Sequence, residues 1–298
     1  MSTTPLLVTG ASGHLGRRVL ELLLARGAGP IIATTRNPDS LKDFAARGVD
    51  VRRADFDDEA SLSQAFRGAG RALLISTDAL DRPGRRLAQH QAAIRAMKAA
   101  GVRHIVYTSL PNPHPGSPIS VAADHRETEA AIQASGLDFT FLRNNLYTDL
   151  FLHSLPAAIA SGQLVDARGT GATAFVTRED CAQAAAAALA EPTTGRHTLD
   201  VTGPEAVTSD ELAALLSELA GRKVVHVSVP PDALVRGMVG HGLPQPAAEL
   251  YASFDAGIQK GELATVTDTV KRLSGHAPQS VRDFLTAHRA VLLPARNT

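Results

Sequence analysis

The first half of the chain alternates short apolar runs with longer amphipathic stretches. The apolar runs, rich in Val, Ile, Leu and Phe, predict buried strands at residues 5–10, 30–36, 49–56, 71–77, 102–110 and 137–145. The stretches between them carry apolar residues at helical spacing and predict helices at 16–27, 39–48, 58–69, 84–101 and 120–136. Because strand and helix alternate strictly, we predict an α/β fold with a doubly wound parallel sheet and helices on both faces.

After about residue 150 this alternation loosens. Residues 177–192 predict one more helix, whose alanine run suits close packing on the sheet. Residues 208–221 predict an amphipathic helix, and the strand-like run 223–230 follows it. The segment 237–263 is rich in Gly and Pro, which predicts loops around short helices.

The turn between the first strand and the first helix contains three glycines, Gly10, Gly13 and Gly16. In such a turn the first glycine permits a tight bend, the second lets the backbone approach a pyrophosphate, and the third lets helix and strand pack closely. The helix N-terminus adds N–H donors and partial positive charge. The alternative is a purely structural turn. The glycine turn stands at the head of at least five further strand–helix units, and this position favours a Rossmann-type dinucleotide-binding sheet.

We therefore expect two parts in the chain. Residues 1–205 are predicted to form the nucleotide-binding domain, with their 150–175 segment interleaved with a second lobe. Residues 206–298 are predicted to form that smaller lobe on the substrate side. It would cover the carboxyl ends of the strands, where ligands bind in folds of this kind.

The end of the second strand indicates which dinucleotide is bound. A carboxylate at this place would take the ribose hydroxyls of NAD. The sequence has no acid between Gly27 and Pro38, and Thr35 and Arg36 stand there instead. Since an arginine pairs well with a phosphate, this favours NADPH. The alternative is an arginine that stacks on the adenine without choosing between the cofactors.

Two further strand ends belong to the same edge of the predicted sheet. Asp55 and Phe56 follow the third strand and are expected to flank the adenine. Ile75, Ser76 and Thr77 end the fourth strand and are expected to line the path of the ribose and nicotinamide. Each set is also compatible with ordinary strand-end chemistry.

Composition excludes several other classes of protein. Lys plus Arg and Asp plus Glu both number 30, which argues against nucleic acid or an anionic membrane as the main partner. The single cysteine, Cys181, excludes an internal disulfide and a thiolate zinc site. The histidines show no HxxxH or HExxH spacing, so no metal is expected. Without a signal peptide or a run of ~20 apolar residues, the protein is expected to be cytoplasmic, with no membrane span.

Several motifs along the chain together resemble a known family. They are VTGASGHLG (8–16), TTRNP (34–38), ADFDDEASL (54–62), LLIST (73–77), VYTSL (106–110) and TREDCAQAAAA (177–187). In order and spacing they are similar to those of the NmrA-like atypical short-chain dehydrogenases/reductases. The likeness is greatest to the group of type 2 NAD(P)H:quinone oxidoreductases.

The resemblance implies which residues contact NADPH and which contact an electron acceptor. The implied cofactor contacts, together with those given above, are Gly10, Ala11, Ser12, Gly13, His14, Leu15, Gly16, Arg36, Asp55, Ser76, Thr77, Thr108, Ser109 and Asn144. The implied acceptor contacts are Leu110, Asn145, Tyr147 and Phe151. The acceptor would be a small, quinone-like molecule.

The chain departs from the wider superfamily in its proton donor. Most of these dehydrogenases use a Tyr-x-x-x-Lys pair, but no lysine stands four residues after Tyr107, Tyr147 or Tyr251. His125 lies close to the place of the missing lysine, where it either faces the site or is exposed on its helix. His125 and Tyr147 are thus the only candidate catalytic side chains.

The missing pair favours some acceptors over others. Hydride transfer is the cofactor's chemistry. It turns a ketone into an alkoxide with a conjugate-acid pKa of ~16, so a nearby acid is needed. A quinone becomes a phenolate-like anion with a pKa of ~10, which can leave and take its proton from water. We predict an NADPH-dependent oxidoreductase for quinone-like or other conjugated electrophilic acceptors. The alternative is an NADP(H)-sensing regulatory protein with little or no turnover.

Overall fold

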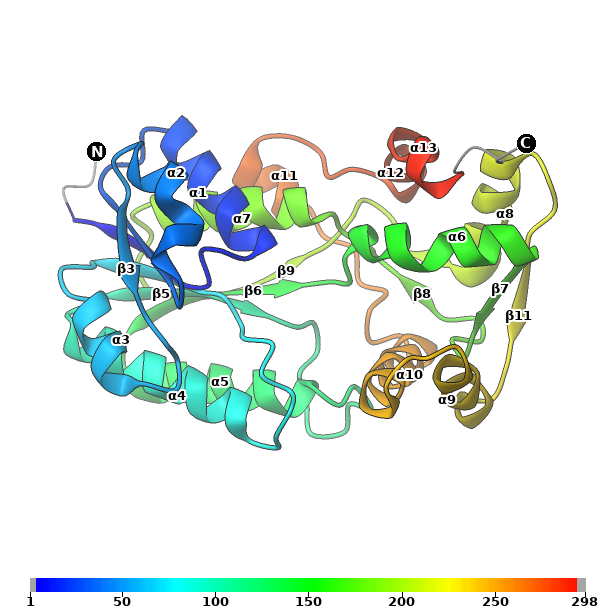
Figure 1. Cartoon of the computed structure of the whole chain (residues 1–298), viewed down its shortest axis with the longest axis horizontal. Coiled ribbons are helices and arrows are strands. Elements are labelled where there is room, and N and C mark those ends of the chain that lie inside the picture. Colours follow the sequence, from blue (N-terminus) through cyan, green and yellow to red (C-terminus); the bar gives the residue numbers. More distant parts are fainter. Residues whose placement is uncertain (1–3, 294–298) are drawn as a thin grey trace.

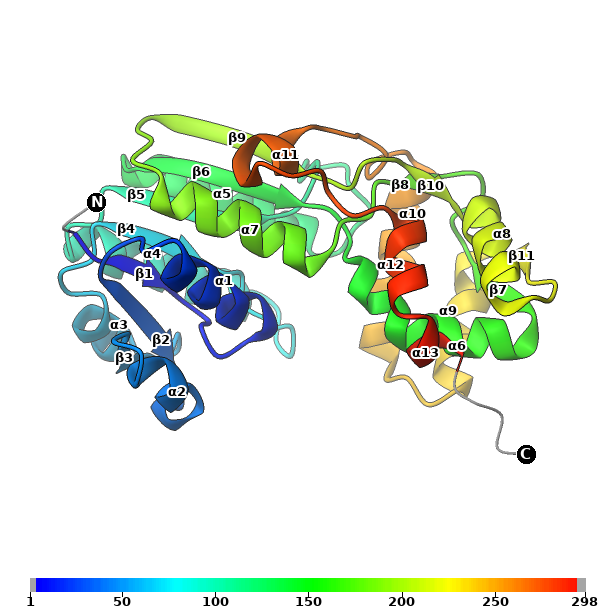
Figure 2. The same cartoon turned by 90° about the horizontal axis from the view of Figure 1, so that it is seen from above.

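The computed structural model describes residues 4–293, and its centre is a seven-stranded parallel sheet (Figures 1 and 2). The strands lie in the order β3-β2-β1-β4-β5-β6-β9. Their bounds are β1 Leu6–Val8, β2 Ile31–Thr35, β3 Asp50–Arg53, β4 Arg71–Leu74, β5 His104–Ser109, β6 Asp138–Asn144 and β9 Arg196–Val201. The predicted doubly wound α/β fold is confirmed. The strand order reverses between β1 and β4, which is where such sheets bind ligands.

Helices cover both faces of this sheet (Figure 1). On one face lie α1 His14–Ala25, α7 Arg178–Ala190 and α11 Thr269–Ser274. On the other lie α3 Glu59–Ala65, α4 Arg85–Ala99 and α5 Ala122–Ser135, while η1 Pro38–Leu41 and α2 Lys42–Ala45 stand beside the edge strand β3. Because successive strand residues point to opposite faces, Leu6 and Val8 join one core and Leu7 joins the other.

The seventh strand is missing from the sequence prediction, which found only six. The run RHTLDV of β9 mixes charged and apolar residues, and only Val201 is buried. This pattern belongs to an edge strand, which has a partner on one side alone: β9 pairs only with β6. The helix before it, α7, follows the prediction, since Ala184 to Ala188 are all buried against the sheet.

A second group of elements lies beyond the carboxyl ends of β5 and β6 (Figures 1 and 2). In it β7 Gln163–Asp166 pairs in parallel with β11 Val225–Ser228, and β8 Ala172–Thr173 pairs with β10 Val207–Thr208. Its helices are η2 Thr148–Leu150, α6 Phe151–Ser161, α8 Ser209–Ala220, α9 Pro231–Gly240, α10 Gln245–Gln259, α12 Val281–Ala287 and α13 Arg289–Leu292. We call this group the second lobe. It has its own core, which includes Phe151 and Phe175.

The prediction of loops around short helices over 237–263 is wrong for most of that segment. Helix α10 alone runs for 15 residues, and α9 precedes it. The two prolines of this segment stand at the start of α10, Pro244 just before it and Pro246 in its first turn. Helix α9 likewise begins at a proline, Pro231. A proline at such a position loses no helical hydrogen bond and starts a helix rather than breaking it.

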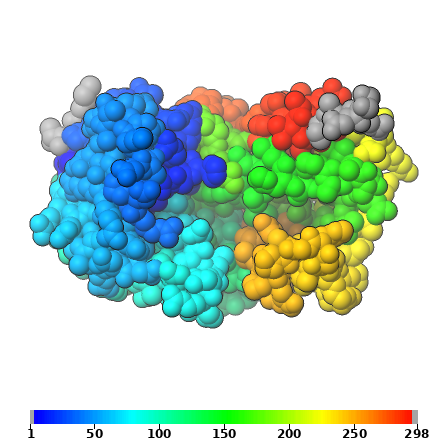
Figure 3. All heavy atoms as spheres, viewed as in Figure 1, coloured from blue at the N-terminus to red at the C-terminus, as the bar shows by residue number. Residues whose placement is uncertain are grey.

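The surface is recessed where the two parts face each other (Figure 3). The recess lies between the N-terminal residues, blue and cyan in the figure, and the green and orange residues of the second lobe. Among the residues that the structure describes, no helix has both the length and the apolar character needed to cross a membrane.

Candidate cofactor and acceptor site

A cavity of about 680 Å³ lies at the carboxyl ends of β1, β2, β3 and β4. We call it the cofactor cavity. The sequence-predicted residues that line it are Gly10, Ser12, Gly13, His14, Leu15, Gly16, Thr35, Arg36, Asp55, Phe56, Ile75, Ser76 and Thr77. Ala11 does not line it, because its methyl group is fully buried in the core and its N–H donates to the Thr34 carbonyl.

The three glycines of the turn have different structural needs. Gly10 has a φ of +58°, which side chains rarely adopt. A Cβ at Gly16 would stand 2.4 Å from the Gly10 oxygen, so helix α1 and the turn pack too closely for any side chain. A Cβ at Gly13 would meet only that same oxygen at an ordinary 3.4 Å. The fold therefore requires Gly16, whereas Gly13 leaves the cavity open to a ligand.

The N-terminus of α1 faces the cofactor cavity without a side-chain cap. Gly13 is the N-cap residue and has no side chain to accept from the first N–H groups of the helix. Such free N–H groups bind phosphate. This observation fits a pyrophosphate held at Gly13 and the first turn of α1.

Arg36 is the cation at the end of β2. It is exposed, and among residues 4–293 no acidic side chain forms an ion pair with it. By contrast, Arg17 forms an ion pair with Asp43, and Arg18 forms one with Glu179 of α7. The guanidinium of Arg36 is thus available to a phosphate, and no carboxylate stands at the end of β2 to select a bare ribose.

Residues that sequence reasoning missed also line the cofactor cavity. The Asp57 carboxylate accepts hydrogen bonds from Arg85 at 2.5 Å and from Gln89 at 3.0 Å. The Arg85 bond is the main reason that the pKa of Asp57 falls to about 2. Arg178, at the start of α7, also lines this cavity. Asp57 and Arg178 lie inside two of the family motifs but were given no role, and Arg85 and Gln89 of α4 belong to no motif.

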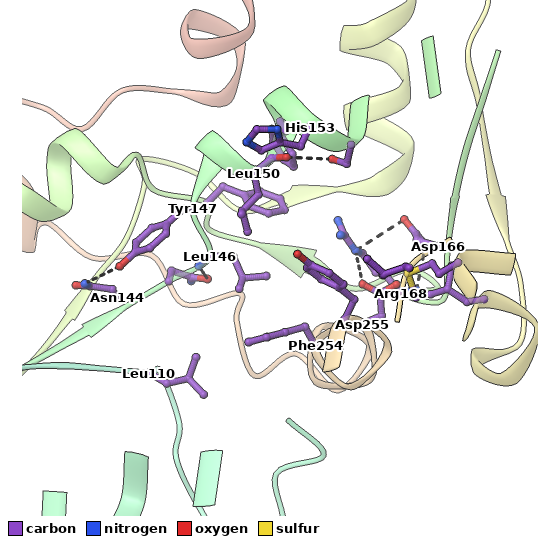
Figure 4. A pocket seen from close by; sticks show the side chains of 18 of the residues that line it. Leu110, Asn144, Leu146, Tyr147, Leu150, His153, Asp166, Arg168, Phe254 and Asp255 are labelled. Atoms are coloured by element: carbon purple, nitrogen blue, oxygen red, sulfur yellow. Dashed lines mark hydrogen bonds and ion pairs between the residues drawn. The ribbon is translucent and has the colours of Figure 1, made fainter. Parts of the chain in front are cut away.

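A second cavity, of about 650 Å³, lies between the sheet and the second lobe (Figure 4). It shares Ser76 with the cofactor cavity, and we call it the acceptor cavity. Nine of the sequence-predicted residues line it, namely Ser76, Thr108, Ser109, Leu110, His125, Asn144, Asn145, Tyr147 and Phe151. Thr108, Ser109 and Asn144, expected at the cofactor, thus lie on the acceptor side of the junction. The apolar residues that sequence reasoning missed come from the second lobe and include Leu150, Phe175, Leu234, Met238 and Phe254.

His125 is buried, so the alternative of an exposed helix histidine is wrong. Its Nε2 lies 2.9 Å from an Arg86 nitrogen, and its Nδ1 lies 2.9 Å from the Tyr107 hydroxyl. Because arginine only donates, Nε2 accepts and the neutral ring carries its proton on Nδ1. That proton is directed to Tyr107. Burial, with the Arg86 charge beside it, lowers the pKa of His125 well below its usual value.

The asparagines and Tyr147 stand at the junction of β6 with the second lobe (Figure 4). Asn144 Nδ2 donates to the Tyr147 hydroxyl at 3.3 Å, and the Arg178 guanidinium lies over the Tyr147 ring. Burial raises the pKa of Tyr147 above its usual value. The Asn145 amide is bonded to the backbone of Leu146 and Leu263. Asn145 therefore fixes the lobe to the sheet.

Among the described residues, no three His, Cys, Asp or Glu side chains lie together in a way that would hold a metal ion. Cys181 is buried in α7, where burial raises its pKa well above the usual value.

The geometry defines a class: a dinucleotide-binding sheet with a second cavity that meets the cofactor cavity at Ser76. The model of the NAD(P)H-binding family matches residues 10–192. The chain is 38% identical to quinone oxidoreductase 2 of Escherichia coli over 94% of its own length and 96% of that protein. It belongs to the NAD(P)H-binding family, in its NmrA-like branch, and is an NAD(P)H-dependent oxidoreductase.

Other comparisons agree with this assignment. The chain is 29% identical to an NAD(P)H azoreductase of Xenophilus azovorans, over 96% of its length and 98% of that protein. The crystal structure of the E. coli NADPH-dependent quinone oxidoreductase complexed with NADPH superposes with a TM-score of 0.89, at 36% identity, covering 95% of this chain and 99% of that one. The crystal structure of Citrobacter sp. triphenylmethane reductase complexed with NADP(H) superposes with a TM-score of 0.88, at 37% identity, covering 95% of this chain and 99% of that one. The family and the NAD(P)H cofactor expected from the sequence are confirmed.

Proposed function

We propose that this protein uses NADPH to reduce quinone-like or other conjugated electrophilic acceptors, and that it needs no protein acid to do so. The relatives that support this proposal reduce quinones, azo compounds and triphenylmethane dyes, as their names state. All of these acceptors are conjugated, and each accepts a hydride into an extended π-system.

The cofactor cavity supports the choice of NADPH. When bound, NADPH supplies the hydride. Gly13 and the first turn of α1 would hold its pyrophosphate, and the unpaired Arg36 would hold its 2′-phosphate. Ser76 lines both cavities, so this residue marks where cofactor and acceptor meet.

The observation that carries the proposal is the state of the two candidate proton donors. His125 Nε2 accepts from Arg86, and its only proton is directed to Tyr107. The Tyr147 hydroxyl is bonded to Asn144, and its raised pKa makes it a weaker acid than a free phenol. The site therefore suits an acceptor whose reduced form leaves as a stabilised anion. A quinone meets this need with a product pKa of ~10, whereas a simple ketone does not.

The acceptor cavity also favours turnover over nucleotide sensing, the alternative that the sequence left open. A sensor needs only the nucleotide site, but this chain encloses a second cavity of about 650 Å³ beside it. The test is NADPH oxidation followed by absorbance, with and without a small benzoquinone. We expect oxidation only when the quinone is present. Tight NADPH binding without quinone-dependent oxidation would favour the sensor.

A further inference from the structure

The end of the acceptor cavity away from Asn144 and Tyr147 holds a charged cluster (Figure 4). Arg168 follows β7, and its Nε donates to Asp255 of α10 at 2.8 Å. The same Nε lies 3.9 Å from Asp166 at the end of β7. All three residues line the cavity, whose other walls are mainly apolar.

The two carboxylates already have partners in the protein. Asp166 accepts hydrogen bonds from the Ser209 hydroxyl and from His226 Nε2. Asp255 accepts from the Ala167 N–H at 3.0 Å. Both side chains are less than a tenth exposed. The two carboxylates fix the Arg168 guanidinium, and each of their oxygens already accepts a hydrogen bond within the protein.

The terminal nitrogens of Arg168 are different. Among residues 4–293 they have no hydrogen-bond partner, while the side chain remains 22% exposed. The guanidinium lies 5.8 Å from the centre of the Phe175 ring, which helps to fix its plane. Figure 4 shows it inside the cavity, between the two carboxylates and the Tyr147 end. Up to four N–H donors thus face the acceptor volume.

Size and charge define the ligand that these donors would bind. A cavity of about 650 Å³ is in the range of drug-sized ligands, well beyond a single quinone ring. The carboxylates Asp166, Asp210 and Asp255 outnumber Arg168 and the His226 ring that bridges Asp166 and Asp210. An anionic group therefore gains little there, whereas a neutral oxygen still gains a hydrogen bond. Resting on the proposed function, we infer that the acceptor is an extended aromatic molecule. Its end remote from the reducible ring carries a neutral hydrogen-bond-accepting oxygen, which Arg168 binds.

Three 2-phenyl-1,4-benzoquinones test this inference. Their 4′ groups are acetyl, isopropyl and carboxylate: a neutral oxygen, its isostere without oxygen, and an anion. Binding is measured calorimetrically on the protein loaded with NADP⁺, so no turnover is needed. We expect the acetyl compound to bind about tenfold more tightly than the isopropyl compound. The carboxylate should bind no more tightly than the isopropyl compound.

In Arg168→Met the ratio between acetyl and isopropyl should fall to about one. In Arg168→Lys, which keeps a cation beside Asp255, it should fall part of the way. Arg236→Met is the matched control, since Arg236 is exposed on α9 and pairs with Asp232 outside the cavity. It should keep the wild-type ratio. Unchanged NADPH affinity and an unchanged circular dichroism spectrum in the Arg168 variants would show that the fold is intact, even though loss of the ion pair with Asp255 lowers the unfolding midpoint.

Equal binding of the acetyl and isopropyl compounds to the wild type would overturn the inference. So would a ratio that survives in Arg168→Met, or a carboxylate that binds most tightly, since that result would indicate an anion site. Failure of the proposed function would look different from failure of this inference. In that case none of the three quinones would support NADPH oxidation, whatever their dissociation constants.

Discussion

The two cavities meet at Ser76 but are built from different parts of the chain. The cofactor cavity is formed by residues 10–89 and Arg178, chiefly at strand ends that the buried sheet fixes. The acceptor cavity takes its walls from segments spread over residues 76–255. The cofactor is one molecule with fixed phosphates, and a rigid sheet edge suits it. The acceptor varies between relatives, and a separate lobe can change its side chains without disturbing the sheet.

Helix α9 of the acceptor cavity differs in burial from the strand residues of the cofactor cavity. In the cofactor cavity Thr34 and Thr35 are almost fully buried strand residues. In the acceptor cavity α9 supplies Leu234 and Met238, and no residue of this helix is fully buried. Substitutions in α9 therefore change the acceptor site at little cost to the core.

The largest effect should come from the glycine turn. Gly16→Val places a Cβ 2.4 Å from a backbone oxygen, so it should prevent stable folding. Gly13→Val should fold, because its Cβ has ordinary contacts and its backbone is extended. It should nevertheless bind NADPH at least tenfold more weakly, since the branched side chain fills the pyrophosphate position. Circular dichroism and NADPH fluorescence titration measure the two outcomes.

Normal NADPH binding by Gly13→Val would show that the turn has only a structural role. Loss of folding in both variants would show that the two glycines are equivalent, contrary to the geometry.

Three buried histidines, His90, His104 and His125, should make the free energy of unfolding depend on pH. Burial lowers the pKa of His90 to about 3, that of His104 to about 4, and that of His125 well below its usual value. The unfolded chain therefore binds protons first, near pH 6.5. The free energy of unfolding is highest above that pH and decreases as the pH falls. Between pH 6.5 and 5 we expect a loss of about 2 kcal/mol for each histidine that stays neutral in the folded state.

Urea unfolding at the two pH values measures this loss, and His104→Gln provides the control. The free energy of unfolding of this variant should fall by about 2 kcal/mol less than that of the wild type between pH 6.5 and 5. Stability that does not change down to pH 5 would mean that these histidines take up protons as readily in the folded protein as in the unfolded chain.

Arg36→Ala should weaken NADPH binding by about ten- to a hundredfold, because a hydrogen bond to a charged group is lost. NADH has no 2′-phosphate, so its dissociation constant should change little. Arg26→Ala, an exposed arginine at the far end of α1, is the control. Equal losses for NADPH and NADH would contradict the assignment of Arg36 to the 2′-phosphate.

The smallest effects should come from removing single proton-bearing groups that line the acceptor cavity or, as Tyr107 does, contact its lining residue His125. Tyr107→Phe, Tyr147→Phe, Tyr251→Phe and His153→Gln should each lower kcat for a benzoquinone by less than about tenfold, since general acids contribute ~10²–10⁴-fold where they act. The kcat should also vary little between about pH 6 and 8, because His125 stays neutral throughout. A loss near a thousandfold in one folded variant would reveal a hidden acid and favour carbonyl reduction.

The sequence predicted most of the residues that line the cofactor cavity but fewer than half of those that line the acceptor cavity, for a physical reason. Phosphate binding needs a glycine turn and a cation at fixed places near strand ends, so Gly13 and Arg36 can be found from local spacing. Arg168, Phe175 and Phe254 come together only through the packing of the second lobe, and nothing in their local sequence indicates a cavity. His125 could be placed on a helix, but its burial depends on Arg86 and Tyr107, which lie far from it in the sequence. Strand β9 was missed because an edge strand tolerates charges.

The central claim is that the protein transfers hydride to acceptors that need no protein acid. The most direct test compares 1,4-naphthoquinone with α-tetralone, a ketone of similar size and shape, by the rate of NADPH oxidation at equal concentration. We expect steady NADPH oxidation with the quinone. With the ketone the rate should be at least about a thousandfold lower, since no side chain protonates the alkoxide. Comparable rates for the two compounds, or oxidation with the ketone alone, would contradict it.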